Sequence, residues 1–209
     1  MVETQTAEVA ANSREAVFRA AALEFGEQGY DAARVDRIAD RAGVNKAMLY
    51  YHFGGKEALY VEVLRDLFRA VSARAAAVAD GAGGAAAKLD AWNAALVEEA
   101  SARPWMPPIM LREVASGGTR LDADTLGLMN RVYGALGRVI AQGQRDGVFR
   151  AVDPLLAHLT ILPPVLLFLA RERMLASRPG GEGLLEPRRL DDFVAHIQGA
   201  ARRMLRRDA

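Results

Sequence analysis

Residues 34–56 read RVDRIADRAGVNKAMLYYHFGGK, a sequence that predicts two short helices joined by a tight turn. Four apolar residues before Gly43 recur at the spacing of one helix face. Gly43 supplies the sharp corner, and Asn45 is a good N-cap for the second helix. Leu49 and Phe53 lie four residues apart on the inner face of that second helix. The stretch therefore predicts a helix-turn-helix.

The second helix of this motif is predicted to present Lys46, Ala47 and Tyr50 to solvent, where it would read the major groove of DNA. Lysine donates to guanine acceptors, alanine contacts the thymine methyl group, and a tyrosine ring also contacts that methyl while its hydroxyl reaches a phosphate. Phosphate contacts would set the register without reading sequence. We expect them from Arg34, Asn45, Tyr51, His52 and Lys56, with a purely structural histidine as the alternative for His52.

The run GVNKAMLYYHFGGKEAL resembles the signature of the TetR (tetracycline-repressor-like) family of bacterial transcription regulators. The similarity extends back through FRAAALEFGEQGY to about Val17 and covers roughly the first third of the chain. The family usually has Thr or Ser at the start of the first motif helix, where the hydroxyl holds a DNA phosphate. This chain has Ala33, Arg34 and Val35 there, so we expect Arg34 to take the phosphate.

Charge and composition fit a DNA-binding protein of the cytosol. Residues 34–56 carry five basic and two acidic side chains, a net charge of +3, whereas residues 1–33 carry two basic and six acidic side chains, a net charge of −4. Positive charge thus concentrates where the motif would meet phosphates. The 209 residues contain no cysteine, and the N-terminal residues do not resemble a signal peptide. We therefore expect a cytoplasmic protein without disulfides.

Helical periodicity continues through the rest of the chain, and no run resembles a strand. The fold class predicted is all-α with about nine helices. Residues 1–56 would form a three-helix DNA-binding head after a mobile arm at 1–11, and residues 57–209 a larger helical regulatory and dimerisation domain. The helices expected in that domain are 56–79, 85–102, 109–115, 122–144, 154–177 and 190–205.

The second domain is predicted to bind a small molecule and to dimerise. Aromatic and Met side chains could line an apolar cavity with two polar anchors; the residues are Trp92, Trp105, Met106, Met110, Tyr133, Phe168 and Met174, with Arg112 and His158 as the anchors. Taken one by one, each is better explained as ordinary core. In the TetR family the last two long helices pair across a two-fold axis, which implies an interface through Leu166, Phe193 and Ile197 here.

No cofactor or metal is expected, because the three histidines lie on different helices and no cysteine is available. The apolar run 155–170 is interrupted by His158 and two prolines, so we interpret it as core or interface and not as a membrane span. No nucleophile–base spacing, phosphate loop or paired-carboxylate motif suggests an enzyme.

The sequence therefore favours a TetR-like regulator, a repressor that an apolar or aromatic small molecule releases from an approximately palindromic double-stranded operator. A helical enzyme and a ligand-insensitive dimer are the alternatives. An enzyme would leave residues 34–56 without a purpose.

Overall fold

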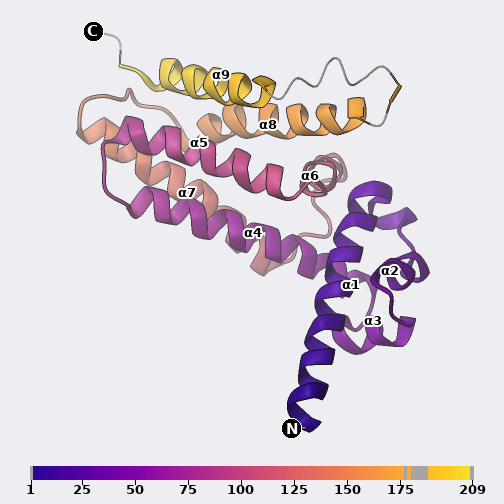
Figure 1. Ribbon diagram of the computed structural model, residues 1–209. Coiled ribbons are helices and arrows are strands. Elements are labelled where there is room, and N and C mark those ends of the chain that lie inside the picture. Colours follow the sequence, from indigo (N-terminus) through magenta and orange to yellow (C-terminus); the bar gives the residue numbers. More distant parts are fainter. Residues whose placement is uncertain (1, 177, 180–187, 208–209) are drawn as a thin grey trace.

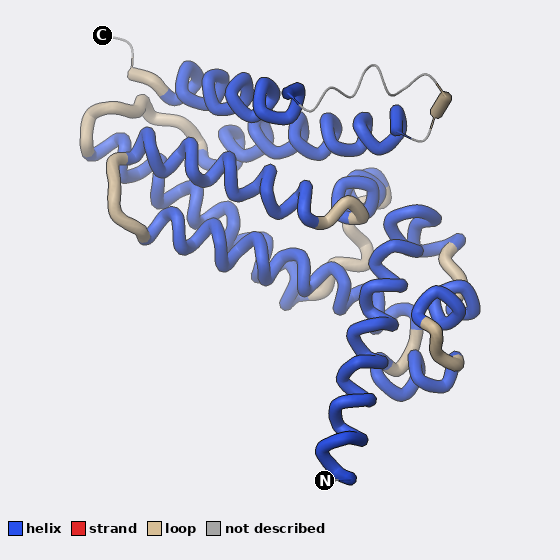
Figure 2. The backbone as a smooth tube through the Cα atoms, in the orientation of Figure 1, coloured by secondary structure: helices blue, strands red, loops and turns tan. Residues whose placement is uncertain are grey.

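The computed structural model describes residues 2–176, 178–179 and 188–207. Helices joined by loops make up this part of the chain, with one isolated β-bridge between Phe149 and Arg206 (Figure 2). Most of the Gly/Pro-rich loop expected after residue 178 lies outside the described residues. The helices are α1 (Val2–Ala32), α2 (Val35–Ala42), α3 (Lys46–Phe53), α4 (Lys56–Asp80), α5 (Ala85–Ala102), α6 (Met106–Ala115), α7 (Ala123–Arg145), α8 (Pro154–Ala176) and α9 (Arg188–Leu205).

Helix α1 begins at Val2, so the mobile arm expected at residues 1–11 is wrong for the residues described there. The N-terminal stretch contains neither Gly nor Pro before Gly26 and is rich in Ala and Glu, which favour helix. Figure 1 shows this extended start of α1 projecting past α3. Gly29, at φ 77°, interrupts the helix geometry near the C-terminal end of α1.

Local signals account for α2 and α3. Gly43 adopts the left-handed conformation after α2, with φ 67°, and its N–H bonds back to carbonyls of that helix. The Asn45 side chain accepts a hydrogen bond of 3.2 Å from the Met48 N–H and so caps α3. Ile38 and Leu49 are fully buried and hold both helices against α1. The predicted helix-turn-helix is confirmed.

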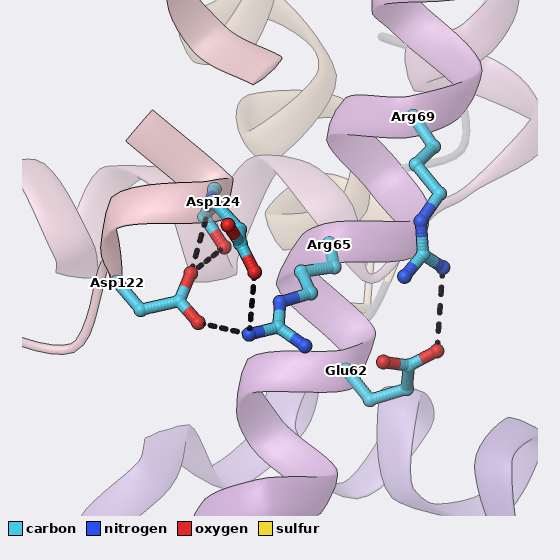
Figure 3. A network of polar contacts seen from close by, with 6 residues as sticks. Glu62, Arg65, Arg69, Asp122 and Asp124 are labelled. Atoms are coloured by element: carbon cyan, nitrogen blue, oxygen red, sulfur yellow. Dashed lines mark hydrogen bonds and ion pairs between the residues drawn. The ribbon is translucent and has the colours of Figure 1, made fainter. Parts of the chain in front are cut away.

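Helix α4 runs from the head through the second domain and packs along α7. Arg65 on α4 pairs with Asp122 and lies 3.3 Å from Asp124, at the first turn of α7, while Glu62 and Arg69 pair at 3.3 Å on α4 itself (Figure 3). The Asp122 carboxylate also accepts from Thr125, so it caps α7 and anchors α4 at once.

The second domain stacks α4, α5 and α7 below an outer layer of α8 and α9 (Figure 1). This outer layer lies at the opposite end of the molecule from α3. The short helix α6 is wedged between α1 of the head and α8. The division at residue 56 stays a prediction, because buried side chains run without a break from α1 into α4 and α6.

Candidate DNA-binding face and ligand cavity

One face of α3 points away from the protein. Lys46, Ala47 and Tyr50 are exposed, as the sequence predicted, whereas Leu49 on the opposite face is fully buried. Tyr51 is 77% exposed and adds a second aromatic ring to the outward side. The helix is thus held by its inner side chains, and its outer side is available to a groove of DNA.

Two of the predicted DNA-binding lysines, one expected to read bases and one to hold a phosphate, have partners inside the protein. Lys46 pairs with Asp36 of α2. The Lys56 ammonium donates to the Asp31 carbonyl at 3.2 Å and lies 4.6 Å from the centre of the Tyr30 ring. These contacts orient both lysines before any DNA arrives, and as exposed ion pairs or hydrogen bonds they are weak enough for a phosphate to replace them.

The Nε2 atom of His52 lies 2.7 Å from the Ser13 hydroxyl, a contact that ties α3 to α1. This geometry fits the alternative of a structural histidine. Arg34 precedes α2 in extended conformation and is exposed, with no side-chain bond to the helix terminus. The first N–H groups of α2 therefore remain uncapped by a side chain and, together with Arg34, offer donors to a phosphate.

A cavity of about 360 Å³ lies between α4, α6, α7 and α8. Four predicted ligand-binding residues contribute to its wall, namely Met106, Met110, Tyr133 and His158. Most of the remaining wall is aliphatic or aromatic and comes from Leu67, Phe68, Val71, Leu96, Leu111, Val114, Leu121, Met129, Val132, Leu159, Leu162, Pro163 and Leu166. The size and lining are those of a site for a small, largely apolar molecule.

The other five predicted ligand-binding residues do not line the cavity; they are Trp92, Trp105, Phe168, Met174 and Arg112. Trp92 is fully buried behind His158, with the two rings 5.8 Å apart, and Phe168 stacks on Phe193 of α9. Trp105 packs so closely on Gly26 that a Cβ at this glycine would lie 2.7 Å from the tryptophan Cβ. These positions reflect helix–helix packing, which periodicity alone does not distinguish from a cavity wall.

Arg112 also points away from the cavity, toward the head. Its guanidinium donates to the carbonyls of Phe25, Gly26 and Glu27 at 3.2, 3.0 and 3.3 Å. These carbonyls belong to the last regular turn of α1 before Gly29. Arg112 therefore fastens α6 to the head, because a cation at a helix C-terminus satisfies carbonyls that the helix leaves free.

Glu113 is a polar group of the cavity wall that the sequence did not single out. It is 2% exposed, and its Oε1 accepts a 2.6 Å hydrogen bond from the Tyr60 hydroxyl. Burial and the adjacent carboxylate raise the pKa of Tyr60, so that its hydroxyl remains a donor at neutral pH. The Tyr60 ring packs against Phe25 and Tyr30 of α1, at 4.8 and 5.0 Å between centroids. The cavity wall is thereby connected to the head.

His158 is the second polar group of the wall, 3% exposed, with its ring 4.4 Å from that of Tyr133. Its Nδ1 atom has no hydrogen-bond partner in the described part of the chain. Burial lowers the pKa of His158 from 6.5 to about 4, since the charged ring would be poorly solvated. The imidazole is therefore neutral at physiological pH.

This depressed pKa predicts a pH-dependent loss of stability. Between pH 6.5 and about 4 the unfolded chain protonates this histidine and the folded protein does not, so the free energy of unfolding should fall as pH falls, by up to about 3 kcal/mol. Chemical denaturation of wild type and His158→Leu across this range measures the difference. The variant should lose less stability than wild type, and exposed His196→Gln should behave as wild type; equal losses in all three would contradict the assignment.

The structure locates the three predicted interface residues inside the protomer or at its helix contacts. Leu166 and Ile197 are 4% and 6% exposed, and Leu166 faces the cavity. Phe193 is half-buried on Phe168. The exposed large apolar side chains of α8 are those of Leu155, Leu156, Leu159, Leu167 and Met174. Leu156 and Leu167 are 11 residues apart, close to three helix turns, so they form one stripe. By length and composition alone α8 could also span a membrane.

Comparisons with known proteins agree with this geometry. Residues 17–63 match the family model of bacterial regulatory proteins of the tetR family. The repressor NicS of Pseudomonas putida is 26% identical over 96% of both chains. The activator FasR of Mycolicibacterium smegmatis is 54% identical over 46 residues, which is only about a fifth of either chain. The crystal structure of the TetR-family regulator PfmR from Thermus thermophilus has 26% identity and a TM-score of 0.70, covering 91% of this chain and 99% of that one.

A helix-turn-helix head with an exposed second helix, joined to a larger helical domain, is the architecture of a DNA-binding transcriptional regulator. The chain belongs to the TetR family, as the resemblance of its first third indicated. The relatives are named as transcriptional regulators, and the chain belongs with them and not with enzymes.

Proposed function

We propose that the protein is a transcriptional repressor that binds an approximately palindromic operator as a homodimer and releases it when a small molecule enters the cavity. The observation that supports DNA binding most strongly is the outward face of α3, which carries Lys46, Ala47 and Tyr50 on a helix fixed by buried Leu49. Repression is favoured over activation because NicS, which aligns with nearly the whole chain, is named a repressor.

The dimer is inferred from the exposed stripe on α8. Leu156 and Leu167 are large apolar side chains exposed on one face of the helix, and a second copy of the same stripe would cover them across a two-fold axis. Because α8 and α9 lie opposite α3 (Figure 1), both heads of such a dimer remain free to face DNA. Two identical heads require two half-sites of opposite orientation, hence a palindrome.

The ligand response is inferred from α6, whose two consecutive residues face different partners. Glu113 faces the cavity, and Arg112 holds the C-terminal end of α1. A ligand that displaces α6 would therefore move the head as well as α4, which also borders the cavity through Leu67 and Phe68. A ligand shifts this equilibrium only by binding one arrangement more tightly, and a coupling of about 1–3 kcal/mol suffices for a switch.

A reporter under the promoter nearest to the gene of this protein tests the proposal. Deleting the gene should raise reporter expression, and supplying wild-type protein should lower it again, because an occupied operator blocks transcription. In the control, the deletion strain receives a Lys46→Ala/Tyr50→Ala variant, which keeps the fold but lacks two of the exposed α3 side chains proposed to contact DNA bases. Unchanged or reduced expression after deletion would exclude repression at that promoter.

A further inference from the structure

Glu113, a residue of the cavity wall, has a buried carboxylate oxygen without a partner among the described residues. Glu113 Oε1 is occupied by the Tyr60 hydroxyl, whereas Oε2 is buried and has no hydrogen-bond partner among the described residues. Glu113 is the only acidic side chain in the described wall of the cavity, which is otherwise almost entirely apolar. An acceptor in this position is expensive to leave unsatisfied, and a charged one more so.

Nearby basic side chains do not supply the missing donor. Arg112, the neighbour of Glu113 in sequence, is committed to three carbonyls of α1. Arg120 pairs with Asp31 at 2.9 Å and lies 4.3 Å from the Tyr30 ring centre. Neither residue belongs to the cavity wall. Among the described residues no donor reaches Oε2, which leaves the contents of the cavity as a source of one.

We propose that the effector is a compact apolar molecule carrying a hydrogen-bond donor, a hydroxyl or a protonated amine, which binds Glu113 Oε2. This inference rests on the proposed ligand response and specifies its chemistry. The cavity wall provides the apolar contacts, among them Met106, Met110 and Phe68. His158, neutral and with Nδ1 unpaired in the described structure, offers a second polar contact for a ligand long enough to reach it.

The same carboxylate discriminates against anionic ligands. A ligand carboxylate next to Glu113 would bring two like charges together in a site that contains no cation in the described wall, and such a contact is unfavourable in an apolar environment. Free carboxylic acids should therefore bind worse than alcohols or amines of the same shape. This preference concerns only the polar group of the ligand, so it can be measured with ligands that share the same apolar part.

Three probes with one ring system test this inference: 2-naphthylmethanol, 2-naphthylmethylamine and 2-naphthoate, each titrated calorimetrically into full-length protein without DNA. The alcohol and the amine should bind at least tenfold more tightly than the carboxylate, as expected for a hydrogen bond to a charged group. Equal affinity for all three, tighter binding of the carboxylate, or no binding of any probe at millimolar concentration would overturn the proposal.

Glu113→Gln isolates the carboxylate. The glutamine carbonyl can still accept from the Tyr60 hydroxyl, while its amide now donates into the cavity, so the tenfold preference should vanish or reverse toward 2-naphthoate. Glu98→Gln, which removes an exposed carboxylate on α5, is the matched control and should keep the wild-type order. A persistent preference in Glu113→Gln would locate the recognition elsewhere.

The experiment separates this inference from the proposed function. If the protein binds its operator but binds the three probes with equal affinity, the proposed function stands and the proposed ligand chemistry is wrong. If the protein prefers the alcohol and the amine but does not bind the operator, the proposed ligand chemistry stands and the proposed function is wrong.

Discussion

Replacing Leu156 and Leu167 together by aspartate should produce monomers and lower operator affinity by about 10³-fold or more. Both side chains are exposed, at 61% and 58%, and neither lines the cavity, so the substitutions should leave the protomer folded. In the proposed dimer they would place four carboxylates against one another in an apolar contact, which opposes association. A single head then contacts one half-site with little advantage over random DNA.

Analytical ultracentrifugation gives the mass of the variant in solution, and a binding titration on operator DNA gives its affinity. Leu126→Asp is the matched control, because it adds the same charge at an exposed leucine of α7, away from the α8 stripe. This control should remain dimeric and bind DNA normally. A dimeric Leu156→Asp/Leu167→Asp protein with full operator affinity would place the interface on another surface.

Lys46→Ala combined with Tyr50→Ala should weaken operator binding by about 1–3 kcal/mol for each side chain while leaving affinity for random DNA nearly unchanged. Both residues are exposed on α3, so their removal leaves the packing of Leu49 and the Asn45 cap intact. Lys46 in addition pairs with Asp36, whose freed carboxylate would then face the DNA in the variant.

Arg138→Ala serves as the control for net charge. Arg138 lies on α7 and pairs with Asp80 at 2.9 Å, so its loss changes the charge of the protein without touching the head. This variant should bind operator as wild type does. Operator affinity that falls equally in Arg138→Ala and in the α3 double variant would reduce the role of α3 to general electrostatics.

The sequence predicted the head more accurately than the second domain because the head depends on short-range signals. Gly43 and Asn45 act on residues within a few positions, so their roles follow from the local sequence. The start of α1 was missed, because residues 2–11, which were expected to form a mobile arm, favour helix and extend α1 toward the N-terminus.

In the second domain, neighbouring residues have opposite roles that only tertiary packing assigns. Leu166 is buried at the cavity whereas Leu167 is exposed, on a helix that is apolar on nearly all sides. Arg112 and Glu113 are likewise adjacent, one directed to the head and the other to the cavity. Periodicity gives no reference direction in such helices, so the predicted anchors and interface residues could not be distinguished from core.

The central claim is that the outward face of α3 recognises a specific DNA sequence. A gel-shift titration of wild type against the DNA flanking its own gene, with a scrambled fragment of equal length, measures this directly at several salt concentrations. We expect two chains per fragment, affinity that falls as salt rises, and at least about 10³-fold preference for the flanking DNA. Equal affinity for both fragments at every salt concentration would contradict the account.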